Sequence, residues 1–173
     1  MRVLPIERLE RISKVPKAQV ILWEEGISLE RDSNLKISDI VRIVASDRWR
    51  LASQHSRHAD QLMSTQPICY RGAISRYYYA MYHALRACTY ISHKGDDFEK
   101  HSVLSSHLPG DLTAGTNWQN MLKDARETRN RADYEPYPSH NLAWKKDALM
   151  IKSNAELTLK MSKKYLKDKG CAL

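Results

Sequence analysis

Residues 75–87 read Ser-Arg-Tyr-Tyr-Tyr-Ala-Met-Tyr-His-Ala-Leu-Arg-Ala, and this stretch decides the fold class. From about residue 70 to residue 91, apolar side chains recur at steps of three and four, which is the period of an α-helix with one buried side. The loop Lys94-Gly-Asp-Asp97 then ends the helix. The buried side is predicted to consist of Ile74, Tyr77, Tyr78, Met81, Leu85 and Cys88, with Ala84 and Ile91 at its edge.

A second strip of side chains runs along the opposite side of the same helix. Its members follow steps of three, four, three and four residues, so at about 100° per residue they stay within a narrow arc that faces away from the core. Such rings suit a dimer seam, another partner surface, or RNA, whose bases stack on Tyr and Arg, and a purely structural role is the remaining alternative. The strip consists of Arg76, Tyr79, His83, Arg86 and Tyr90.

Punctuation on both sides of this helix predicts further helices. One covers about 39–63 and is capped by Ser38, a third is capped by Thr116 and must end before Pro136, and a last one is capped by Ser139. Four substantial helices with short connections predict an all-α fold, an antiparallel four- to five-helix bundle.

The first 34 residues read as an N-terminal arm, and residues 35–173 as the bundle. The arm contains one short strand-like run, Val20-Ile-Leu-Trp23. Its six basic and six acidic residues cancel, whereas residues 140–173 carry eight basic and three acidic residues, and the whole chain has a net charge of +8. A basic surplus favours polyanionic partners, although a lysine-rich helix face is more often simply solvated.

Several classes of protein are excluded by composition. No stretch approaches 18 consecutive apolar residues and charges interrupt the N-terminus, so we expect neither a membrane span nor a secretory signal. The three cysteines are widely separated, which predicts neither a zinc module nor a disulfide framework and indicates a reducing cytoplasm. His55 and His58 have only Asp60 nearby as a further ligand, so we expect no metal site and no cofactor.

The third predicted helix carries a polar quartet beside its apolar stripe. Arg126, Arg129, Asn130 and Asp133 lie at i, i+3, i+4 and i+7, along one flank. In one interpretation Arg129 and Asp133 form an exposed intrahelical ion pair, worth some tenths of a kcal/mol. In the other, two guanidiniums clamp a phosphate and stabilise the charge that develops during phosphodiester cleavage.

Three elements together resemble the HEPN (higher eukaryotes and prokaryotes nucleotide-binding) family. Residues 75–87 are similar to the R-x-Y-Y-A-x-F-H-A-A-R-A helix of small prokaryotic HEPN proteins. Lys100-His-Ser102 resembles their K-x-H-S element, and Arg129-Asn-Arg-Ala-Asp-Tyr134 resembles their R-x-x-A-D-Y signature. The order and separations of these elements also agree over about residues 40–165.

The resemblance implies a four- to five-helix bundle that commonly forms homodimers. Many HEPN proteins are metal-independent endoribonucleases of prokaryotic toxin–antitoxin or phage-defence systems, with a nucleotidyltransferase-like or ATPase protein as partner. Their catalytic signature is an Arg followed, after four to six residues, by a His at the dimer cleft. In this sequence the corresponding positions after Arg129 hold Tyr134, Glu135 and Pro136.

The first functional hypothesis is therefore an endoribonuclease with a rearranged acid–base group. In it Arg126 and Arg129 hold the phosphate, Asp133 orients an arginine, and Tyr134 or a histidine such as His101 handles the proton.

The second hypothesis is a catalytically inactive HEPN module. It binds RNA or nucleotide, or docks on a partner, through the strip from Arg76 to Tyr90 together with Asn130. A helical structural subunit with an incidental basic end is the third.

Overall fold

The computed structural model describes residues 5–173, and every regular element in that part of the chain is helical. The all-α prediction is confirmed. The strand-like interpretation of Val20–Trp23 is wrong, because this run lies inside a helix; a short apolar run alone does not distinguish the two. The α-helices are α1 (Ile6–Ser13), α2 (Lys17–Ser33), α3 (Ile37–Met63), α4 (Tyr70–His93), α5 (Gly115–Tyr134) and α6 (Lys145–Asp168), with 3₁₀ turns η1 (Leu104–Ser106) and η2 (Asn141–Trp144).

The chain divides into two compact units, the first ending at Ile40 and the second spanning Val41–Leu173. The structural division falls inside α3, whereas the sequence places the end of the arm at residue 34. In the first unit, α2 has no buried residue. Within the described residues, no helix is long and apolar enough to cross a membrane.

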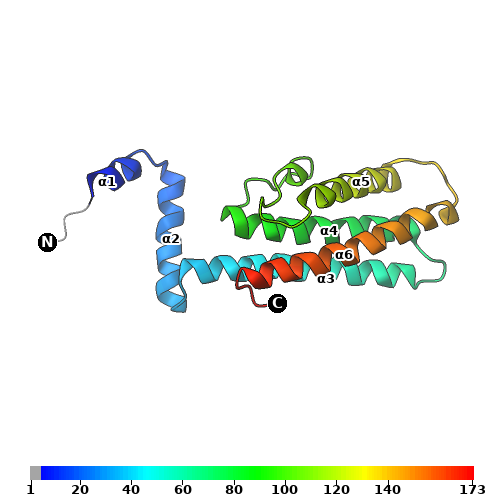
Figure 1. Ribbon diagram of the computed structural model, residues 1–173, viewed down its shortest axis with the longest axis horizontal. Helices are drawn as coiled ribbons and strands as arrows, with labels where there is room; N and C mark the ends of the chain where they lie inside the picture. Colours follow the sequence, from blue (N-terminus) through cyan, green and yellow to red (C-terminus); the bar gives the residue numbers. More distant parts are fainter. Residues whose placement is uncertain (1–4) are drawn as a thin grey trace. The chain divides into compact units, whose positions relative to one another are not determined.

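The second unit is an antiparallel bundle in which α3, α4, α5 and α6 alternate in direction (Figure 1). Helix α4 packs against both α5 and α6. The Tyr77 hydroxyl donates to Asp60 of α3 at 2.6 Å, and the Trp49 indole of α3 donates to Ser162 of α6 at 3.0 Å. The predicted bundle is confirmed, with α4 in contact with each of the other three helices.

The six residues of the predicted core side of α4 are buried, as is Ala84 at its edge, whereas Ile91 is half-buried. Tyr77 and Tyr78 are 0% and 1% exposed, and each hydroxyl has a hydrogen-bond partner, which offsets the cost of removing it from water. Leu122 of α5, with Ile151 and Leu166 of α6, completes the core.

Helix boundaries agree with the sequence prediction more closely than the caps do. Ser38 and Thr116 lie inside helices, and Ser139 precedes η2 rather than capping α6. A hydroxyl residue caps a helix only where its own backbone is still outside it, and this depends on the preceding turn. Before α5, for example, Ala114 takes a left-handed conformation with φ 58° and occupies the cap position, so the helix starts two residues earlier than expected.

Candidate functional site

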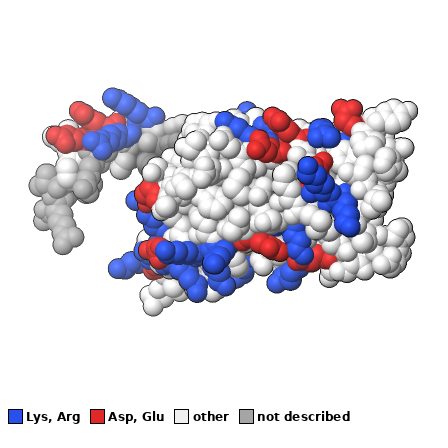
Figure 2. Space-filling view, turned by 45° about the vertical axis from the view of Figure 1, so that its right-hand side comes forward, with Lys and Arg blue, Asp and Glu red and all other residues white. Residues whose placement is uncertain are grey.

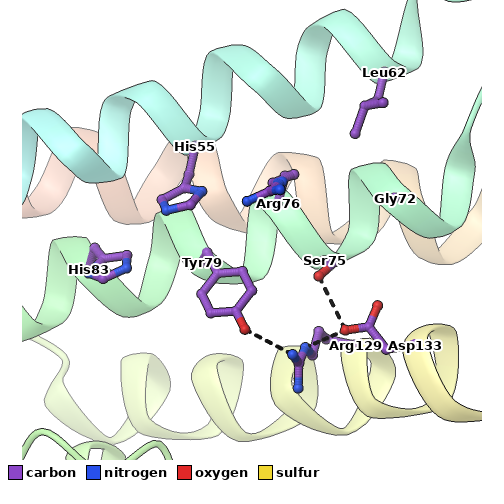
Figure 3. A pocket seen from close by; sticks show the side chains of 9 residues that line it. All are labelled: His55, Leu62, Gly72, Ser75, Arg76, Tyr79, His83, Arg129 and Asp133. Carbon is purple, nitrogen blue, oxygen red and sulfur yellow. Dashed lines mark hydrogen bonds and ion pairs between the residues drawn. The ribbon is translucent and has the colours of Figure 1, made fainter.

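An open groove of about 540 Å³ lies between α3, α4 and α5 (Figure 3). Its floor is α4, which contributes the side of the helix opposite the apolar stripe. Most of its lining side chains are polar, charged or aromatic, in contrast to the apolar core below. The lining consists of His55, Leu62, Gly72, Ser75, Arg76, Tyr79, His83, Arg129 and Asp133.

Arg129 is fixed at one wall of the groove by contacts on three of its nitrogens. Nη2 donates to the Tyr79 hydroxyl at 2.8 Å, Nη1 donates to Oδ1 of Asn130 at 3.1 Å, and Nε lies 2.7 Å from Oδ2 of Asp133. The Ser75 hydroxyl donates to the same carboxylate oxygen at 3.3 Å. The intrahelical ion pair suggested by the spacing is present, and it orients a guanidinium toward the floor of the groove.

A stack of rings forms the other wall and the floor. The imidazoles of His55 on α3 and His83 on α4 are parallel, with centroids 5.2 Å apart, and His55 also stacks on Tyr79 at 5.4 Å. The Nδ1 atoms of both histidines are buried without a hydrogen-bond partner. Burial, together with the neighbouring His55, lowers the pKa of His83 to about 4, and burial and Arg76 lower the pKa of His55. His83 is therefore neutral at pH 7.

His101 lies next to the groove, in the loop between α4 and α5. Its Nδ1 shares a 2.6 Å hydrogen bond with the Tyr78 hydroxyl, and its ring stacks on Tyr82 with centroids 4.0 Å apart. The main-chain oxygen of His101 accepts a hydrogen bond from Nη1 of Arg126 at 3.2 Å. Burial, Arg129 and Arg126 lower the pKa of this imidazole. The fold thus brings His101 beside both arginines of the quartet.

The C-terminal end of the predicted strip has a different role. Arg86 and Arg48 both bind the carboxylate of Asp96, with Nε of Arg86 at 2.8 Å and Nη2 of Arg48 at 2.7 Å. Arg86 also contacts Glu99 at 3.1 Å, and the Arg48 guanidinium carbon lies 5.0 Å from the centre of the Tyr90 ring. These contacts tie the loop that carries His101 to α4.

The strip of α4 does not face freely outward, and this corrects the sequence prediction. Only Arg76 is exposed, whereas Tyr79, His83, Arg86 and Tyr90 are half-buried. Helical spacing separates the strip from the apolar stripe but carries no information about neighbouring helices. In the bundle, α3 and α5 flank this side of α4, so Arg76, Tyr79 and His83 line the groove, whereas Arg86 and Tyr90 do not.

The structure gathers part of the predicted catalytic set. Arg129 and Asp133 line the groove. Asn130 accepts a hydrogen bond from Arg129, and the main-chain oxygen of His101 accepts one from Arg126. Tyr134 is 72% exposed, and the Arg129 guanidinium carbon is 5.4 Å from its ring centre.

His55 is a member of this site that the sequence alone does not predict. The sequence contains a signal, because Ala52 lies three residues before His55 and Ala59 four residues after it, at helical spacing. Both alanines are fully buried in the structure. That spacing places His55 on the inward side of α3. Which residues of α4 it meets depends on how the helices are aligned, and spacing within one helix does not determine this.

The charged side chains that line the groove include more positive than negative groups. On the face drawn in Figure 2, Lys and Arg are interleaved with Asp and Glu, and uncharged surface lies between them. The residues lining the groove include two arginines, Arg76 and Arg129, and one carboxylate, Asp133. The local surplus at the groove is therefore positive, which suits an anionic ligand.

Fold and site together define a helical-bundle protein with an arginine- and histidine-lined groove. The family model of the HEPN domain matches residues 45–166, most of the chain, and the protein belongs to the HEPN domain family. The family assignment made from the sequence is confirmed, and it relates the protein to nucleotide or RNA chemistry. A comparison with curated proteins finds no significant match to any individual one.

Proposed function

We propose that this HEPN protein binds RNA through the groove between α3, α4 and α5. It acts as a homodimer in the cytoplasm, in a prokaryotic toxin–antitoxin or phage-defence system with a nucleotidyltransferase-like or ATPase protein as partner. The observation that carries the proposal is the fixed guanidinium of Arg129, with Arg76 exposed on the same groove.

Arg129 is suited to a phosphate because its geometry is set before any ligand arrives. Each terminal nitrogen of an arginine carries two N–H groups. Tyr79 and Asn130 take one from each nitrogen, so each terminal nitrogen keeps one further N–H group. Arg129 is 17% exposed, so less water screens the interaction than at a free surface. Arg76 adds a second guanidinium from α4.

The test is RNA binding by two matched arginine variants. Arg129→Ala is expected to weaken the binding of a fluorescently labelled single-stranded RNA by about tenfold or more, which corresponds to ~1.4 kcal/mol. Arg131→Ala makes the same charge change on the exposed side of α5, outside the groove, and should alter the dissociation constant by less than about twofold. Equal losses of affinity in the two variants would mean that binding depends only on net charge. That result would contradict binding in the groove.

A second candidate function, metal-independent RNA cleavage, is favoured by two imidazoles, those of His55 and His83, which line the same groove as Arg129. A neutral imidazole accepts a proton, and with its pKa at about 4 His83 is in that form at pH 7. In such a reaction the imidazole removes the proton of the ribose 2′-hydroxyl, and the 2′-oxygen bonds to phosphorus. The 5′-oxygen leaves with a proton from a second group, and Arg129 stabilises the extra negative charge.

Cleavage is tested by incubating the protein with transfer RNA and total cellular RNA in EDTA. Discrete products ending in a 2′,3′-cyclic phosphate, lost in His83→Asn, His55→Asn and Arg129→Ala, would support the nuclease. If the wild-type protein binds RNA without cutting it, the alternative of a catalytically inactive HEPN module is favoured. Its function is then to dimerise or to deliver RNA to a partner.

A further inference from the structure

Helix α2 carries an apolar stripe for which the first unit provides no core. Val20, Trp23 and Ile27 follow steps of three and four residues and are 36%, 44% and 66% exposed. None of the residues of α2 is buried. Apolar surface gains about 25 cal/mol per Å² when it leaves water, so a stripe of this size favours association.

The charges that border this stripe follow a pattern of their own. Lys17, Glu24 and Arg31 are seven residues apart and alternate in sign along one flank. Since seven residues are close to two turns, all three lie beside the stripe, and all three are exposed. The opposite flank carries Gln19 and Gly26, which are uncharged, and Glu30 follows Ile27 by three residues, where it ends the apolar stripe.

The symmetry of a homodimer turns this pattern into a choice of orientation. A two-fold axis that relates antiparallel helices brings the same flank of both copies together, whereas parallel helices set one flank against the opposite one. In the antiparallel case Lys17 of each copy can face Glu24 of the other. In the parallel case the charged flank meets the flank of Gln19 and Gly26, and these two residues offer Lys17 and Glu24 no opposite charge.

We infer that α2 pairs with α2 of a second copy of this chain, in an antiparallel contact. Val20 of each helix packs against Trp23 of the other, and Lys17 of each faces Glu24 of the other. The occupant is a second copy because the pattern is complementary to itself. Residues 17–33 lie outside the HEPN match at 45–166, so the contact uses no residue of the groove.

The first test is the mass of the full-length protein by sedimentation equilibrium. Trp23→Glu places a charge in the stripe and is expected to halve the weight-average mass at the same concentration. Leu29→Glu is the matched control, because Leu29 is 46% exposed but lies on the far side of the helix from Val20. It should leave the mass unchanged. The inference is overturned if Trp23→Glu keeps the wild-type mass, or if both variants lose it equally.

A charge-reversal cycle tests the orientation. Lys17→Glu and Glu24→Lys should each weaken self-association by about tenfold, because each creates two like-charge pairs. The double variant restores opposite charges in an antiparallel dimer and should return to within about threefold of the wild-type constant. Failure of the double variant to recover overturns the antiparallel pairing. Circular dichroism of every variant confirms that the helical content is retained.

Discussion

Two aspartates of the second unit, Asp96 and Asp133, each bind an arginine beside α4, but their surroundings differ. Asp96 lies between Arg48 and Arg86 and ties down a loop, while Asp133 pairs with Arg129 one turn away on the same helix. The first arrangement joins segments that are distant in sequence. The second leaves the guanidinium open to a groove. The same kind of ion pair thus joins distant segments in one region and holds a groove-lining guanidinium in the other.

The same substitution at the two aspartates should have unequal effects on stability. Asp96→Asn leaves two guanidiniums, 24% and 16% exposed, without their shared countercharge, and should lower the free energy of unfolding by about 2 kcal/mol. Asp133→Asn removes a local i,i+4 pair and should cost less than about 1 kcal/mol. Urea denaturation measures both. Equal losses of unfolding free energy would show that the two ion pairs contribute equally to stability.

The difference between these regions also marks the limit of sequence reasoning. The apolar stripe of α4 was predicted because its period belongs to one helix. Helical spacing places Arg86 in a binding strip, because the residues near it in sequence do not indicate that the following loop brings Asp96 against it. His55 was missed for the same reason, since its partners Tyr79 and His83 are on another helix. Local period determines which side of a helix is buried, whereas the packing of distant segments determines the site.

The buried imidazole of His83 should make the stability of the second unit depend on pH. Burial and His55 hold its pKa at about 4, below the ordinary value of 6.5, so the unfolded chain takes up the proton first as the pH falls. The stability that the neutral ring contributes is present above pH 6.5 and is lost as the pH falls from 6.5 toward 4. The loss is on the order of 2 kcal/mol.

His83→Gln is expected to flatten the stability profile in this window. The measurement is the free energy of unfolding from urea melts at pH 7 and pH 4.5, taken as the difference between variant and parent. Taking the difference removes the contribution of carboxylates, which protonate in both proteins. His140→Gln, at an exposed histidine outside the groove, is the control and should keep the parent profile. An unchanged slope in His83→Gln would mean that the ring stack does not exclude the charged form.

Two tyrosine hydroxyls, those of Tyr78 and Tyr79, lie on different sides of α4, and their removal should affect RNA affinity differently. Tyr79→Phe removes the acceptor for Nη2 of Arg129, and Tyr78→Phe removes the partner of Nδ1 of His101. Each should lower the free energy of unfolding by about 1 kcal/mol, the usual cost of losing one such bond. Only Tyr79→Phe should change RNA affinity, by about threefold, because Arg129 keeps Asp133 and loses one fixed contact. Anisotropy titrations of the two variants measure this. A tenfold loss would indicate that the Tyr79 hydroxyl itself contacts RNA, and a loss in Tyr78→Phe instead would move the binding site toward His101.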